Sequence, residues 1–184
     1  MMELTTYFKK HSSWITKQYE HIPTYHDAFF LEHASDLFVH INNVTENEMF
    51  KYKIDQYTST AIILKYNGEY LLHFDNYDSF QWEEIMKALG GVLQQGTGEG
   101  LMHDRRMSVK MKALGDNQLH LQFDYGEDHL VSSAILPKKE FIYLLIKEAQ
   151  KYYSLLMHFG TRFPYDFDHV KRNSGVDLHK TYGK

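Results

Sequence analysis

Three stretches of alternating apolar and polar residues between residues 101 and 136 constrain the fold of this chain more than any other feature. A period of two is typical of strands with one buried face, because successive side chains of a strand point to opposite sides. Two turns, Gly115-Asp116-Asn117 and Gly126-Glu127-Asp128, separate the stretches. The pattern predicts a three-stranded antiparallel meander. Its solvent side would carry Lys110, Lys112, His120, Gln122 and Asp124.

A long amphipathic helix is predicted directly after the meander, over residues 138–159. Pro137 suits a first helical position, and Gly160 ends the pattern. We expect this helix to pack on the sheet through one apolar stripe. The stripe consists of Phe141, Leu144, Leu145, Ala149, Tyr152, Leu155 and Leu156.

A β-hairpin is predicted over residues 57–74. Asn67-Gly68 supplies two residues that readily adopt positive φ in a type I′ turn, and strand-like stretches flank them. Two further strands are predicted before the hairpin, at 36–41 and 50–54, because apolar residues alternate there as well.

A second helix is predicted over residues 79–95. Asp78 is expected to cap its first turn, with Gln81 reaching back to the cap. Gly90-Gly91 either ends this helix early or lets it approach the sheet closely. The apolar stripe consists of Trp82, Ile85, Met86, Leu89 and Leu93.

An N-terminal helix is predicted within residues 3–22, where Pro23 interrupts a near-helical spacing of Leu4, Phe8, Ile15, Tyr19 and Ile22. The elements together predict an α+β fold with a mostly antiparallel sheet. We expect residues 1–160 to form a single α+β domain. Residues 161–184 would form a polar C-terminal tail that is docked or partly disordered.

Composition limits the classes of partner. The 184 residues carry a net charge of −4, so they lack the basic excess that binding to nucleic acid requires. No apolar run is long enough to span a bilayer, and the chain has no cysteine. We therefore expect a cytoplasmic protein that contacts neither nucleic acid nor membrane.

A polar cluster at residues 103–106 follows the glycines of Gly96-x-Gly98-x-Gly100. Glycines at this spacing let backbone amides approach an anion, and alternation places His103 and Arg105 on the core-facing side, as at a pocket edge. The competing interpretation is a flexible connector followed by a solvated strand end. The candidate binding residues are Trp82, Gly98, His103, Asp104, Arg105 and Arg106.

No sequence motif identifies a type of reaction. The twelve histidines form no H-E-x-x-H motif, and no serine occupies a G-x-S-x-G motif. We therefore assign no catalytic residue, no metal ligand and no cofactor. Whether the chain is an enzyme stays open, with the balance against it.

Aromatic residues make up 15% of the chain, and aromatics with a polar tip favour protein interfaces. We therefore expect a non-enzymatic protein-interaction module that binds another protein. By analogy of class, small acidic bacterial immunity or antitoxin proteins share this profile. The alternative is a small enzyme or ligand-binding domain for an anionic small molecule, with a pocket near residues 96–106. A homo-oligomer is a third possibility.

Overall fold

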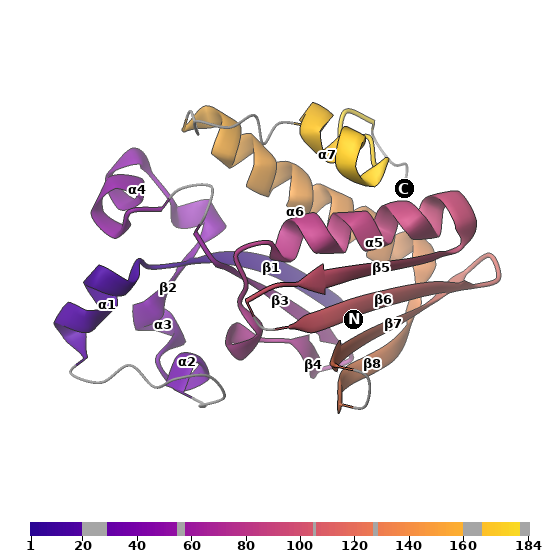
Figure 1. Cartoon of the computed structure of the whole chain (residues 1–184), viewed down its shortest axis with the longest axis horizontal. Coiled ribbons are helices and arrows are strands. Elements are labelled where there is room, and N and C mark those ends of the chain that lie inside the picture. The colour runs from indigo at the N-terminus through magenta and orange to yellow at the C-terminus, as the bar shows by residue number, and fades with distance from the viewer. Residues whose placement is uncertain (20–28, 55–57, 105, 127–128, 160–166, 181–184) are drawn as a thin grey trace.

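The computed structural model describes residues 1–19, 29–54, 58–104, 106–126, 129–159 and 167–180. These residues form an α+β fold with two antiparallel four-stranded sheets (Figure 1). The first sheet has the spatial order β2 (Phe38–His40), β1 (Met2–Lys9), β3 (Thr60–Tyr66) and β4 (Glu69–Leu72). The second has the order β5 (Thr97–Met102), β6 (Met107–Leu114), β7 (Gln118–Tyr125) and β8 (His129–Pro137).

Two long helices, α5 (Gln81–Gln95) and α6 (Lys138–His158), pack against both sheets. The shorter helices are α1 (Ser12–Gln18), α2 (Phe29–Glu32), α3 (Ala34–Leu37), α4 (Glu46–Tyr52) and α7 (Phe167–Ser174). Two 3-10 turns, η1 (Ile41–Asn43) and η2 (Phe74–Asn76), complete the described elements. None of the helices in the described ranges is long and apolar enough to cross a membrane.

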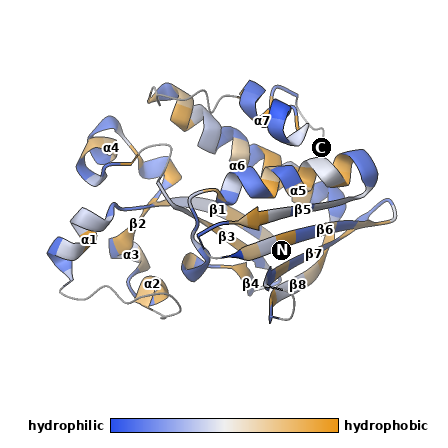
Figure 2. Cartoon of the chain, in the orientation of Figure 1, coloured by the Kyte–Doolittle hydropathy of each residue, from blue (hydrophilic) through white to orange (hydrophobic). Residues whose placement is uncertain are grey.

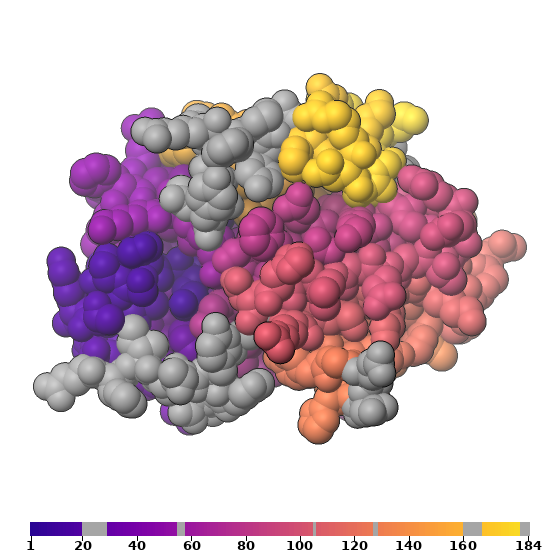
Figure 3. All heavy atoms as spheres, in the orientation of Figure 1, coloured from indigo at the N-terminus to yellow at the C-terminus, as the bar shows by residue number. Residues whose placement is uncertain are grey.

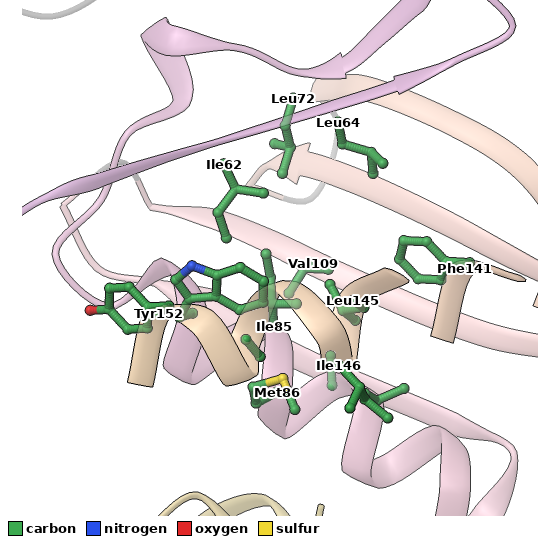
Figure 4. Close-up of a cluster of buried hydrophobic side chains, with 14 of the residues drawn as sticks. Ile62, Leu64, Leu72, Ile85, Met86, Val109, Phe141, Leu145, Ile146 and Tyr152 are labelled. Atoms are coloured by element: carbon green, nitrogen blue, oxygen red, sulfur yellow. The ribbon is translucent and has the colours of Figure 1, made fainter. Parts of the chain in front are cut away.

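One main core lies between the sheets and the two long helices. Ile62 of the first sheet and Val109 of the second both belong to it, together with residues of α5 and α6 (Figure 4). Trp82 of α5 is 1% exposed and stacks on Tyr152 of α6, with the ring centroids 5.9 Å apart. The two sheets meet where the Ser132 hydroxyl of β8 donates a hydrogen bond to the Leu71 carbonyl oxygen of β4.

A second core covers the opposite face of the first sheet. Ala61 and Ile63 of β3 point into it, whereas their neighbour Ile62 points into the main core. Its other members come from the short N-terminal elements: Ile15, Phe30, Leu37 and Phe38. The first sheet is therefore buried on both faces.

The C-terminal helix α7 lies against α5 (Figures 1 and 3). Most of its residues are hydrophilic (Figure 2), but Val170 and Ser174 are buried. A methyl group on Gly90 of α5 would collide with the backbone carbonyl of Ser174, so glycine is what permits this close approach. Val176 and Leu178, just beyond α7, also join the main core.

One side chain of α5 and one of α6 accept hydrogen bonds from strand amides that lie beyond the end of a shorter neighbouring strand. The Ile62 amide of β3 lies beyond the pairing with β4 and donates to Oε1 of Gln81 over 2.8 Å. The Thr6 amide of β1 lies beyond β2 and donates to Oε1 of Glu148 over 3.1 Å. Buried amides of this kind destabilise a fold unless they are paired.

The predicted α+β class is confirmed, as are the hairpin, the meander and the long helix after it. Asn67 and Gly68 both have positive φ, as a type I′ turn requires. The helix at 79–95 is confirmed as α5, but its predicted capping arrangement is wrong. Asp78 accepts from the amides of Phe80 and Asp104, while Gln81 bonds to Ile62 and Asn76.

The predicted N-terminal helix is wrong over its first half. Residues 2–9 form β1, which pairs with β3 along almost its whole length, and only Ser12–Gln18 are helical. Leu4 and Phe8 are four residues apart, which fits both a helix turn and two strand periods. Tertiary pairing decided in favour of the strand.

The strand predicted at 36–41 is only partly confirmed, because β2 covers Phe38–His40 and residues 34–37 are helical. The strand predicted at 50–54 is wrong. Thr45 and Glu48 form a capping box that starts α4, so Phe50 and Tyr52 lie on a helix instead.

Candidate functional site

The second sheet has one face turned away from α5 and α6, and several large side chains on it are exposed. We call it the outer face. The antiparallel register arranges its residues in three rows across the four strands. These rows are Thr97, Lys112, His120 and Ile135; Glu99, Lys110, Gln122 and Ser133; and Leu101, Ser108, Asp124 and Leu130.

Asp124 organises the polar centre of the outer face. It is 4% exposed, and its carboxylate lies 3.1 Å from the Lys110 ammonium. The Gln122 amide nitrogen donates to both carboxylate oxygens, over 2.8 and 2.9 Å. This network fixes the Lys110 and Gln122 side chains, since a buried carboxylate needs such partners. Asp124, predicted as solvent-facing, is therefore buried beneath its own neighbours.

A hollow of about 460 Å³ lies on the outer face, at the end nearest the turn from α5 into β5. Its volume falls within the range of small-ligand sites. His120, at its rim, is 2.7 Å from the Ser133 hydroxyl and is thereby held in place. Residues from three strands line the hollow, among them Thr97, Glu99, Lys110, Lys112, His120 and Gln122.

Large apolar side chains border this polar centre. Leu101 is 49% exposed at the β5 edge, while Leu130 and Ile135 are 60% and 51% exposed on β8. An apolar patch with a polar centre is typical of a surface that contacts another molecule.

The glycine pattern Gly96-x-Gly98-x-Gly100 has a structural role that its sequence did not reveal. Gly96 ends α5 with a left-handed φ of 81°. A methyl group on Gly98 would collide with the carbonyl oxygen of Ala88, and one on Gly100 with that of Glu84. The two glycines therefore let β5 lie directly on α5. The flexible connector predicted at residues 96–100 is wrong for residues 97–100, which belong to the edge strand β5.

The candidate residues His103, Asp104 and Arg106 lie between β5 and β6. His103 is exposed, against the predicted core-facing orientation, because β5 ends at Met102; its ring packs edge-on against Phe80. The Asp104 carboxylate accepts from the Ser79 amide and hydroxyl. Arg106 has a left-handed φ of 51°, and Arg105 lies outside the described residues.

The structure does not bring the candidate residues together. Trp82 is enclosed in the core, while Gly98 adjoins the hollow several residues from the 103–106 turn. The residues that line the hollow with it, Lys110, Lys112 and His120, were assigned in the sequence to an ordinary wet face. Their alternation was the available signal, but alternation alone does not distinguish a flat face from a hollow one.

Within the described ranges, no three histidine or acidic side chains are grouped so that they could hold a metal ion. No protein-family model, no curated protein and no solved structure matches this chain. The function must therefore be argued from the geometry of the chain itself.

Proposed function

We propose that this chain is a non-enzymatic, cytoplasmic protein-interaction module that binds another protein through its outer face. The observation that carries the proposal is the exposure of Leu101, Leu130 and Ile135 around a polar centre on a sheet face that no described helix covers. Burying such side chains against a partner releases about 25 cal/mol per Å² of apolar surface.

The rows define the chemistry that a partner would need. Lys112 and His120 lie side by side next to Ile135, so the partner would place an acidic side chain beside an aliphatic one. Lys110 is already ion-paired with Asp124, so its charge is less available to a partner. A bacterial immunity or antitoxin role stays a proposal, and the partner's identity tests it.

Affinity purification from the native host cytosol tests the interaction. Wild-type protein should recover one stoichiometric partner, and Ile135→Asp and Leu101→Asp should each lose it, because a carboxylate would enter an apolar contact. Phe50→Ser is the matched control, since Phe50 is 87% exposed on α4, outside the outer face. Equal recovery by all four proteins would sink the proposal.

A second candidate function rests on the hollow. Its volume of about 460 Å³ and the presence of Lys112 and His120 favour an anionic small molecule. Mass spectrometry of the purified protein after denaturation tests this. A retained anionic metabolite that Lys112→Gln abolishes, together with a blank in the partner purification, would favour the ligand-binding function over the interaction module.

A further inference from the structure

A basic cleft of about 280 Å³ lies at the end of the first sheet where β1 finishes and β3 begins. Its walls come from residues 9–12, from Lys53 just after α4, and from residues 58–59. Backbone hydrogen bonds fix both sides: the Lys9 amide donates to Ser59, and the His11 amide donates to Tyr52. The cleft is therefore built from three chain segments that backbone hydrogen bonds hold together.

The charge of the cleft has one sign. Among the described residues, three lysines and one histidine line it, the other described lining residues carry hydroxyl groups, and none of these is acidic. The Lys9 ammonium lies 4.4 Å from the centroid of the Tyr77 ring, so we assign the positive charge of the cleft to Lys10 and Lys53.

A carbonyl oxygen and two aromatic rings contact the Lys10 ammonium, and no carboxylate of the described residues is ion-paired with it. The ammonium donates to the Asp36 carbonyl oxygen over 2.6 Å and lies over the rings of Trp14 and Tyr52, 4.3 and 4.8 Å from their centroids. The Asp36 carboxylate instead accepts from the Tyr19 hydroxyl. Burial lowers the pKa of Lys10, which is the direction that a nearby anion would reverse.

We propose that this cleft binds a phosphate group, either free or carried by a small metabolite. The Lys53 ammonium and the Ser12 hydroxyl supply donors to the phosphate oxygens. The Ser59 hydroxyl also lines the cleft and lies 3.1 Å from the Ser79 hydroxyl. The volume lies just below the range of drug-sized ligand sites, which favours a small anion over a nucleotide. This site is on the first sheet and is independent of the outer face.

Titration of the full chain with inorganic phosphate, followed by ¹H–¹⁵N NMR at constant ionic strength, tests the proposal. We expect saturable shifts at the amides of Ser12, Lys53 and Ser59. Lys53→Asn should weaken binding at least tenfold, and asparagine tolerates the left-handed φ of 53° at that position. Ser12→Ala should also weaken it, while Lys139→Gln at the exposed start of α6, outside the cleft and the outer face, should leave it unchanged.

A parallel titration with glycerol phosphate distinguishes the two sources of the ligand. Tighter binding of the monoester identifies a phosphorylated metabolite, and equal or weaker binding identifies free phosphate. Non-saturable shifts would overturn the proposal, as would equal losses in Lys53→Asn and Lys139→Gln. Thermal melting checks that Lys53→Asn and Ser12→Ala are both folded.

Discussion

The backbone amide of Ile62 donates to the Gln81 side chain at the point where β4 is too short to pair with β3. Gln81 is fully buried, and its amide nitrogen donates in turn to the Asn76 carbonyl oxygen. One helical side chain thus takes the place of a missing strand, and it anchors α5 to the first sheet.

Replacing Gln81 with leucine should therefore destabilise the protein by about 2 kcal/mol, because it leaves a buried amide without an acceptor. Urea denaturation followed by circular dichroism measures this loss. Gln95→Leu, at the exposed end of the same helix, should change stability by no more than about 0.5 kcal/mol. Similar effects for both substitutions would contradict the role of Gln81.

Replacing Gly98 with alanine should destabilise the protein by about 3 kcal/mol, because the added methyl group meets the Ala88 backbone, which cannot move like a side chain. Gly96→Ala is the matched comparison. Nothing lies within 4 Å of its added methyl group, but the left-handed φ should cost about 1 kcal/mol. Chemical denaturation of the two variants should rank them in that order, and a reversed ranking would argue against direct contact between β5 and α5.

The buried Lys10 predicts a pH dependence at the alkaline end. Burial lowers the pKa of Lys10 from 10.5, against the opposing charges of Tyr52 and Asp36 and with a small contribution from Lys51. The folded state therefore releases this proton at a lower pH than the unfolded state, so stability rises with pH from the folded pKa up to 10.5. Relative to Lys10→Met, the wild type should gain stability across that window. If the free energy of unfolding differed between wild type and Lys10→Met by the same amount at every pH in that window, the lowered pKa of Lys10 would be ruled out.

Asp177 predicts a pH dependence at the acid end. The hydrogen bond from Lys171 is the main reason why the pKa of Asp177 lies below 3.8, and the His179 amide adds to it. The resulting stabilisation is fully present above pH 3.8 and disappears as the pH falls through the folded pKa. The stability gap between wild type and Asp177→Asn should close in acid. Lys171→Gln should shift that closure toward higher pH, and unchanged closure would refute the ion pair.

The sequence correctly predicted the elements that have a clear turn motif or an uninterrupted apolar period. Asn67-Gly68 specifies its turn through backbone conformation alone, and α6 carries its stripe over the whole length between Pro137 and its end. The meander was predicted because its strands alternate cleanly, with one face on the core and the other exposed.

The remaining elements depend on contacts between distant residues. The strand β1 is buried on both faces, so its sequence lacks a clear wet side, and its identity depends on pairing with β3. The capping box of Thr45 and Glu48 was a readable signal for α4, but the alternation of Phe50 and Tyr52 obscured it. The roles of Gly98 and Gly100 require the position of α5, which local sequence does not contain.

The hydrogen bond from Thr6 to Glu148 joins residues 142 positions apart, and this separation governs the order in which the chain can fold on the ribosome. β1 emerges first, yet it must wait for β3 and then for most of α6. At typical synthesis rates the interval from Thr6 to Glu148 lasts on the order of ten seconds. Until α6 emerges, the β1 side chains that belong to the main core lack the α6 part of that core, so the nascent chain keeps apolar surface exposed there.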